Sequence, residues 1–120
     1  MRNMVVAGGQ LGPISRDETK ASAVNRMIAL MHQAASRGAQ LIVFPELALT
    51  TFFPRWWVEN KTDFDHMFER EMPNEDVLPL FETSKKLNIA FHLGYAELTP
   101  DGHRYNTAII VNSIGKIIGT

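Results

Sequence analysis

The stretch LIVFPELALTTFFPR, residues 41–55, joins a run of four apolar residues to a Pro-Glu pair and a second apolar patch. Leu41 to Phe44 combines aliphatic and aromatic side chains without polar alternation, which predicts a strand covered on both faces of a sheet. Pro45 lacks a backbone donor and should end that strand. Glu46 is therefore expected at the carboxyl end of a buried strand, where open α/β sheets place their ligand sites.

The segments upstream of this stretch alternate between strand and helix patterns. Met4 to Gly8 is a short apolar run closed by glycine, which predicts another buried strand. The S-x-x-E spacing from Ser15 to Glu18 predicts a capping box at the start of a helix. An apolar stripe at helical spacing extends that helix over 16–37.

The segments downstream continue the alternation after a less regular region. We expect a long loop over 47–72, with a helical turn or two around Asp63 to Phe68. Asn74 is a candidate cap for a second helix that runs to Leu87. An antiparallel meander of three strands should follow, in Ile89–Tyr95, Asn106–Val111 and Lys116–Ile118. The order β-α-β-loop-α-β-β-β predicts an α/β fold with helices packed on a sheet face.

Composition excludes several classes of function. The 120 residues carry a net charge of −1 and no block of basic residues, so binding to nucleic acid or to an anionic membrane is not expected. No apolar run is long enough to cross a bilayer and the opening residues lack a signal peptide pattern, which predicts a soluble, cytoplasmic protein. With no cysteine, the chain supplies neither disulfides nor a thiol nucleophile.

Glu46 has two interpretations that the local pattern leaves equally open. The apolar side chains around it could shield the carboxylate from water, and such burial suits a group that exchanges protons near neutrality; they are Phe44, Leu47, Phe52, Phe53, Trp56 and Trp57. Alternatively, Glu46 caps the following segment or pairs with Arg55. The first interpretation predicts an acid-base catalyst and the second a structural residue.

Further polar and aromatic residues near Glu46 are candidates for a substrate pocket. We expect Thr50, Phe53 and Trp56 to line it, although the aromatic rings could equally fold back as core and the threonine could bond its own loop. Asn106 could hold the loop after Glu46 or serve a turn. The histidines are dispersed without ligand spacing, so no metal site is predicted; they are His32, His66, His92 and His103.

The segment IVFPE, residues 42–46, resembles the strand-and-glutamate motif of the nitrilase superfamily, the carbon-nitrogen hydrolases. Other segments resemble that superfamily in the same order along the chain, namely 5–10, 34–39, 105–107 and 115–119. Residues 46–55 (ELALTTFFPR) and 93–97 (LGYAE) are similar to the members that hydrolyse N-carbamoyl-D-amino acids. The resemblance extends over essentially the whole chain.

The resemblance implies the fold and the chemistry. It implies that residues 1–120 form the N-terminal part of a single carbon-nitrogen hydrolase domain, an α-β-β-α sandwich. It also implies a Glu-Lys-Cys triad in which Glu46 is the glutamate. The reaction would convert an N-carbamoyl-D-amino acid to the D-amino acid, ammonia and carbon dioxide, without metal or organic cofactor, in a homo-oligomer.

The sequence departs from the superfamily pattern in two of the three triad positions. There is no cysteine, and the chain stops before the expected lysine, because Lys116 belongs to the turn and strand that precede it. We therefore expect either a piece of a longer enzyme or a truncated product that another chain completes. A non-catalytic interaction piece and another amidase or carbamoyl hydrolase remain alternatives.

Overall fold

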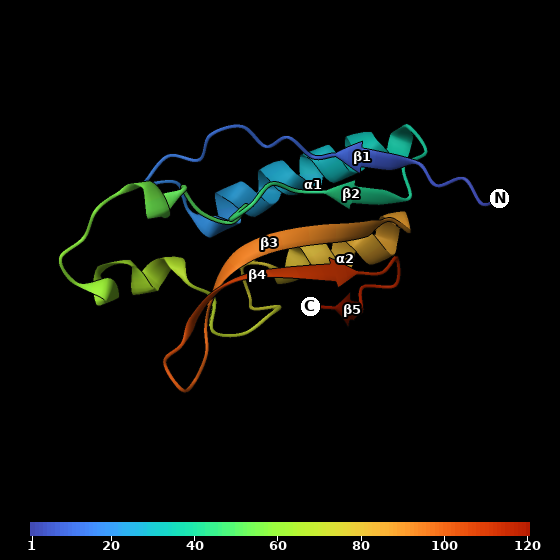
Figure 1. The fold of residues 1–120 in the computed structure, drawn as a ribbon. Coiled ribbons are helices and arrows are strands. Elements are labelled where there is room, and N and C mark those ends of the chain that lie inside the picture. The colour runs from blue at the N-terminus through green and yellow to red at the C-terminus, as the bar shows by residue number, and fades with distance from the viewer.

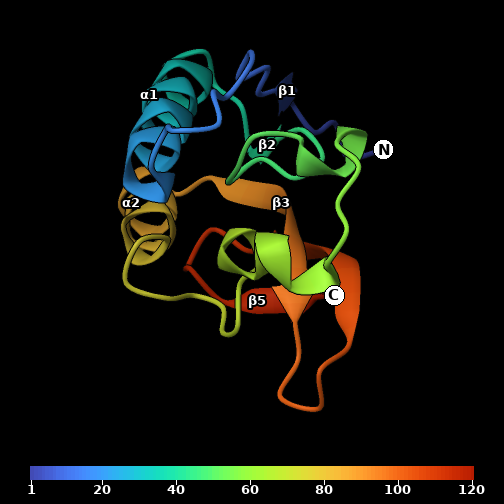
Figure 2. The same cartoon turned by 90° about the vertical axis from the view of Figure 1, so that its left-hand side faces the viewer.

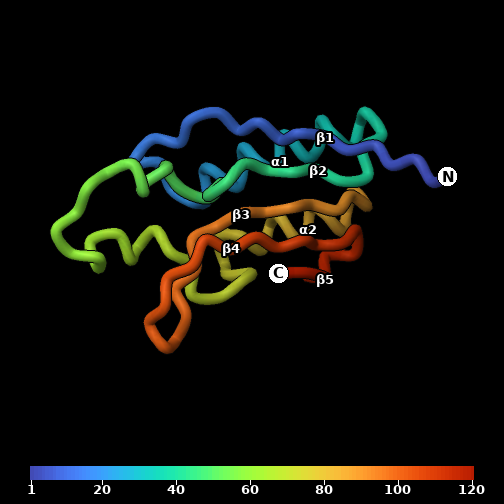
Figure 3. The backbone as a smooth tube through the Cα atoms, in the orientation of Figure 1, coloured from blue at the N-terminus to red at the C-terminus, as the bar shows by residue number.

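The computed structural model describes residues 1–120, and its elements follow the predicted order. The strands and α-helices are β1 (Val6–Gly8), α1 (Lys20–Ser36), β2 (Leu41–Val43), α2 (Leu78–Leu87), β3 (Ala90–Leu98), β4 (Arg104–Val111) and β5 (Ile117–Gly119). Two short 3-10 helices, η1 (Phe53–Arg55) and η2 (Lys61–Met67), interrupt the long segment between β2 and α2. This segment, green to yellow in Figure 3, extends beyond the carboxyl ends of β2 and β3.

The strands form one sheet in the order β1-β2-β3-β4-β5 (Figure 1). β1, β2 and β3 are parallel, whereas β3, β4 and β5 form the antiparallel meander that the sequence predicts. The connections between parallel strands are right-handed, and two such connections that step in the same direction across a sheet place their helices on the same face of that sheet. Accordingly, α1 and α2 lie side by side on one face of the sheet (Figure 2). The α/β prediction is confirmed.

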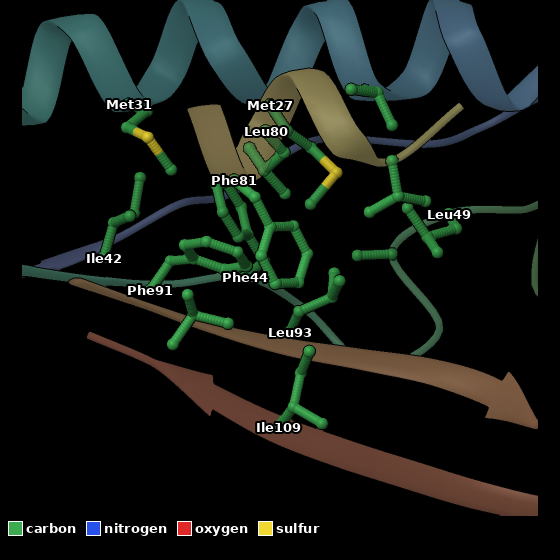
Figure 4. Packing of buried hydrophobic residues seen from close by; sticks show 14 of the residues in the cluster. Met27, Met31, Ile42, Phe44, Leu49, Leu80, Phe81, Phe91, Leu93 and Ile109 are labelled. Carbon is green, nitrogen blue, oxygen red and sulfur yellow. The ribbon is translucent and has the colours of Figure 1, made fainter. Parts of the chain in front are cut away.

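The core fills the space between the two helices and the covered face of the sheet (Figure 4). Met27 and Met31 of α1 are fully buried, as is Leu80 of α2. They meet alternate residues of β2, β3 and β4, including Ile42, Phe91, Leu93 and Ile109. This packing fixes the register of β2 and β3, because a slip by one residue would turn their apolar side chains away from the helices.

The opposite face of the sheet is not covered by this chain. Its side chains alternate with those of the core, and several apolar ones are well exposed: Val6 (52%), Val43 (38%), Ile110 (42%) and Ile118 (62%). Neither helix has the length and apolar character needed to span a membrane.

The start of α1 differs from the prediction. Thr19, rather than Ser15, is the N-cap, and its hydroxyl accepts a hydrogen bond from the Ser22 backbone N–H at 3.1 Å. Glu18 cannot complete a box with Ser15 because its carboxylate binds the Arg26 guanidinium at 2.9 Å. Hydrogen bonds from Arg26 also hold the pKa of Glu18 below its usual value.

The start of α2 also lies later than Asn74. The Asn74 side chain does accept a hydrogen bond from the Val77 backbone N–H at 3.2 Å, so it stabilises a turn. The regular helix begins only at Leu78, with Pro79 in its first turn, where a missing donor is tolerated.

Candidate active site

Glu46 lies in a turn that is fastened to the neighbouring strand β3. On one side of it, the Phe44 backbone N–H donates to the His92 carbonyl at 3.1 Å. On the other side, the Ala48 N–H donates to the Gly94 carbonyl at 3.0 Å. The carboxylate is therefore carried by a backbone segment that is anchored at both ends, at the carboxyl end of β2 as predicted.

Leu47, the next residue, adopts a backbone conformation that non-glycine residues rarely use. Its φ is +48°, and this left-handed conformation costs about 1–2 kcal/mol for an L-residue with a Cβ. The Leu47 side chain is only 6% exposed and packs in a small cluster with Phe53, Phe64 and Met67. Burial of the Leu47 side chain offsets the backbone strain. Because the turn is sharp, the Glu46 side chain and the buried Leu47 side chain point in different directions.

Gly94 allows the turn to approach β3 closely. A Cβ at this position would lie 3.4 Å from the Glu46 Cα and 3.5 Å from the Leu47 nitrogen. The absence of a side chain on β3 at this point therefore contributes directly to the position of Glu46.

Asn106 of β4 contacts the Glu46 carboxylate directly. Its Nδ2 donates a hydrogen bond to Glu46 Oε1 at 2.5 Å, although the two residues are 60 positions apart in sequence. Asn106 pairs with Ala96 of β3, so the sheet register places the amide beside the turn. The contact is charge-assisted, which is the stronger class of hydrogen bond.

The predicted environment of Glu46 needs correction in two respects. Glu46 is exposed, because the expected aromatic shield is not formed: Phe52 and Trp57 are 47% and 83% exposed. Glu46 also forms no ion pair with Arg55, whose guanidinium lies over the Trp56 ring at 4.7 Å. The physical reason is that Glu46 sits at the edge of the sheet face that this chain leaves uncovered.

Two cavities meet at Glu46. One, of about 150 Å³, is lined by Thr50, Thr51 and Arg55 together with the loop 11–14. The other, of about 290 Å³, lies on the β4 side and contains Asn106. Glu46, Leu47 and Phe52 line both.

The three predicted pocket residues occupy different places. Thr50 lines the smaller cavity and Phe53 the larger one. Trp56 lines neither; it is half-buried, and the guanidinium groups of Arg16 and Arg55 lie 5.2 and 4.7 Å from its ring centroid. Their roles in substrate binding stay predictions.

The larger cavity also contains residues that the sequence reasoning did not select. Phe68 and Arg104 line it from segments far from Glu46 in the chain. Arg104 lies two positions before Asn106 on β4, so strand periodicity places both on one face and could have identified it. Arg104 is paired with Asp65 at 2.7 Å. Nowhere do three or more His, Asp or Glu side chains gather in a metal-binding arrangement.

Comparison with known proteins identifies the family. The carbon-nitrogen hydrolase family profile matches residues 5–120. The chain belongs to this family, the nitrilase superfamily, and its mixed α/β sheet agrees with that fold.

Individual relatives and a solved structure match most of the chain. A nitrilase from Meyerozyma guilliermondii is 31% identical over 100 residues, which are 79% of this chain and 31% of that protein. An arylacetonitrilase from Fusarium vanettenii is 29% identical over 118 residues, 94% of this chain and 34% of that protein. The crystal structure of an amidase from Nesterenkonia sp. has a TM-score of 0.74 at 19% identity, over 97% of this chain and 41% of that one. The chain thus spans about a third of the length of the curated relatives it matches.

Proposed function

We propose that this chain is the glutamate-bearing part of a carbon-nitrogen hydrolase that acts on N-carbamoyl-D-amino acids. The observation that carries the proposal is the place of Glu46: it follows β2, on an anchored turn, and its carboxylate accepts a hydrogen bond from Asn106. Its exposure fits a group that must reach reacting atoms supplied from outside these 120 residues.

The proposed chemistry assigns Glu46 the proton transfers. A cysteine from outside this chain attacks the carbamoyl carbon, and its thiol proton passes to Glu46 and then to the departing nitrogen. Water next attacks the carbonyl carbon of the thioester, the carbon–sulfur bond breaks, and Glu46 takes a proton from the water and gives it to the departing sulfur. One water is consumed, and the resulting carbamic acid loses carbon dioxide. A lysine, also from outside, stabilises the oxyanion.

The preference for N-carbamoyl amino acids rests on two features. Residues 46–55 and 93–97 resemble members of the family with that activity. In addition, Arg55 lines the smaller cavity beside Glu46 and forms no ion pair with an acidic side chain. Its charge is available to the carboxylate that such a substrate carries.

Hydrolysis of nitriles is the second candidate. It is favoured by the names of two relatives, a nitrilase and an arylacetonitrilase. Both candidates use the same glutamate, so the substrate distinguishes them.

The test is ammonia release by the full-length protein from four compounds: an N-carbamoyl-D-amino acid, its L-enantiomer, an arylacetonitrile and a simple amide. We expect the first to have the highest kcat/KM, and Arg55→Met to lower that value by ~10-fold or more while sparing the uncharged amide. Arg70→Met, at an exposed site, is the matched control. Preference for the nitrile would replace the proposed substrate class, and release from none of the four would refute hydrolysis.

The source of the nucleophile is tested by the intact mass of the protein purified from its native source. We expect a mass well above 13.5 kDa, with a cysteine and a lysine in the additional residues. A mass of 13.5 kDa would instead require a separate chain to bring both groups.

A further inference from the structure

We propose that Asn106 is the positioning residue of Glu46 and that it decides which carboxylate oxygen does the chemistry. The inference rests on the proposed role of Glu46 as the acid-base group. The Asn106 amide occupies Oε1, so Oε2 is left as the oxygen that exchanges protons with nucleophile and water.

The contact is selective for one oxygen. Asn106 Nδ2 lies 2.5 Å from Oε1, and Oε2 has no hydrogen-bond partner among the side chains of this chain. A carboxylate without such a tether rotates about its last side-chain bond, where the rotational preference is broad. One strong hydrogen bond to one oxygen fixes that rotation and so directs the other oxygen.

The chemistry of the amide suits positioning better than proton transfer. An Asn Nδ2 only donates hydrogen bonds and does not ionise in the pH range of proteins. It therefore holds the carboxylate in place without competing as a base. The geometry is held by the sheet, since Asn106 faces Ala96 in the β3–β4 register and the Glu46 turn bonds to β3 through Gly94.

Few other charges act on the Glu46 carboxylate. Arg55, Arg104 and Tyr105 are the titratable side chains that share a cavity with it, and none forms an ion pair or a hydrogen bond with it. Arg104 is already paired with Asp65. Asn106 is thus the one side chain that forms a hydrogen bond with the Glu46 carboxylate.

The first test is the activity of Asn106→Ala in the full-length protein. We expect kcat for the best substrate to fall ~10–100-fold with KM nearly unchanged, because misdirecting a catalytic group slows chemistry more than binding. Asn25→Ala, on the exposed side of α1, removes an amide elsewhere and should keep wild-type kcat.

The second test is the pH profile of Asn106→Asp, which nearly preserves side-chain volume and so guards against a folding defect. A second carboxylate beside Glu46 favours a protonated pair, so the acidic limb of the kcat profile should move ~1 pH unit or more to higher pH. A residue that only supports the fold would leave the limb in place.

The outcomes separate this inference from the proposed function. Loss of activity in Glu46→Gln together with wild-type kcat in Asn106→Ala, or an unmoved acidic limb in Asn106→Asp, overturns the positioning role alone. Wild-type activity in Glu46→Gln refutes the role of Glu46, and the inference with it. A lower kcat with unchanged KM in Asn106→Ala, together with a shifted acidic limb in Asn106→Asp, supports the positioning role of Asn106.

Discussion

The ammonium group of Lys20, in the first turn of α1, lies 2.7 Å from Oε1 of Glu69, whose side chain is only 3% exposed. The Lys20 amine is not aligned as a hydrogen-bond donor, so the interaction is mainly charge attraction. Asn74 donates to the other oxygen at 2.5 Å, and the Glu69 backbone pairs with Ala96 and Leu98 of β3. Glu69 therefore fastens the end of the long segment to both α1 and the sheet.

Removing the Lys20 charge should destabilise the protein. Lys20→Met leaves a buried carboxylate uncompensated, which is expected to lower the free energy of unfolding by about 3 kcal/mol. Adding Glu69→Leu should restore part of the loss, because the charge that needed compensation is gone. Urea unfolding of the single and double variants measures both effects. A Lys20→Met protein as stable as the wild type would show that the pair contributes nothing.

Two adjacent glycines at the end of β1 should respond oppositely to alanine. A Cβ on Gly9 would lie 2.8 Å from a Phe44 ring carbon and 3.0 Å from Ile42 Cδ1, whereas one on Gly8 would meet nothing within 4 Å. Gly9→Ala should therefore cost about 1–3 kcal/mol of stability through overpacking. Gly8→Ala is the matched control and should be neutral or slightly stabilising. Equal thermal midpoints for the two variants would contradict the packing described for Phe44.

The ionisation of Tyr95 should make stability fall in alkali. Burial, with the charges of Glu97 and Glu69, raises the pKa of Tyr95 to about 12, against 10.0 for the unperturbed group. Between about pH 10 and pH 12 the unfolded chain loses this proton while the folded chain keeps it, so stability falls as pH rises. Allowing for solvent screening, the loss is about 1–2 kcal/mol.

Tyr95→Phe isolates this contribution. The variant should lose less stability than the wild type across the same pH range, and Tyr105→Phe, at a position 52% exposed, is the control. The difference between the absorbance titrations of the wild type and Tyr95→Phe reports the ionisation of Tyr95 alone. Half-ionisation near pH 10 would show that Tyr95 is not buried as described.

Local sequence patterns predicted the elements that depend on local chemistry. The apolar run 41–44 and Pro45 placed a strand end before Glu46, and the turn residues around Gly102 and Gly115 placed the meander. Both glycines have positive φ, a conformation that glycine adopts readily, so their presence in the sequence indicated the positions of the turns.

The features that depend on distant contacts were not predictable in the same way. Arg26 reaches back to Glu18 and moves the cap of α1 to Thr19, a competition that the S-x-x-E spacing does not reveal. The exposure of Glu46 depends on which sheet face the helices cover, which only the assembled topology decides. The left-handed φ of Leu47 has no signature in a residue that otherwise avoids this conformation.

The most direct test of the central claim is ammonia release by Glu46→Gln in the full-length protein. The amide keeps the size of the side chain but cannot take a proton, so turnover should fall by ~10²–10⁴-fold or more with the circular dichroism spectrum unchanged. Glu82→Gln, exposed on α2, is the matched control and should retain activity. Wild-type turnover by a folded Glu46→Gln protein would contradict the account.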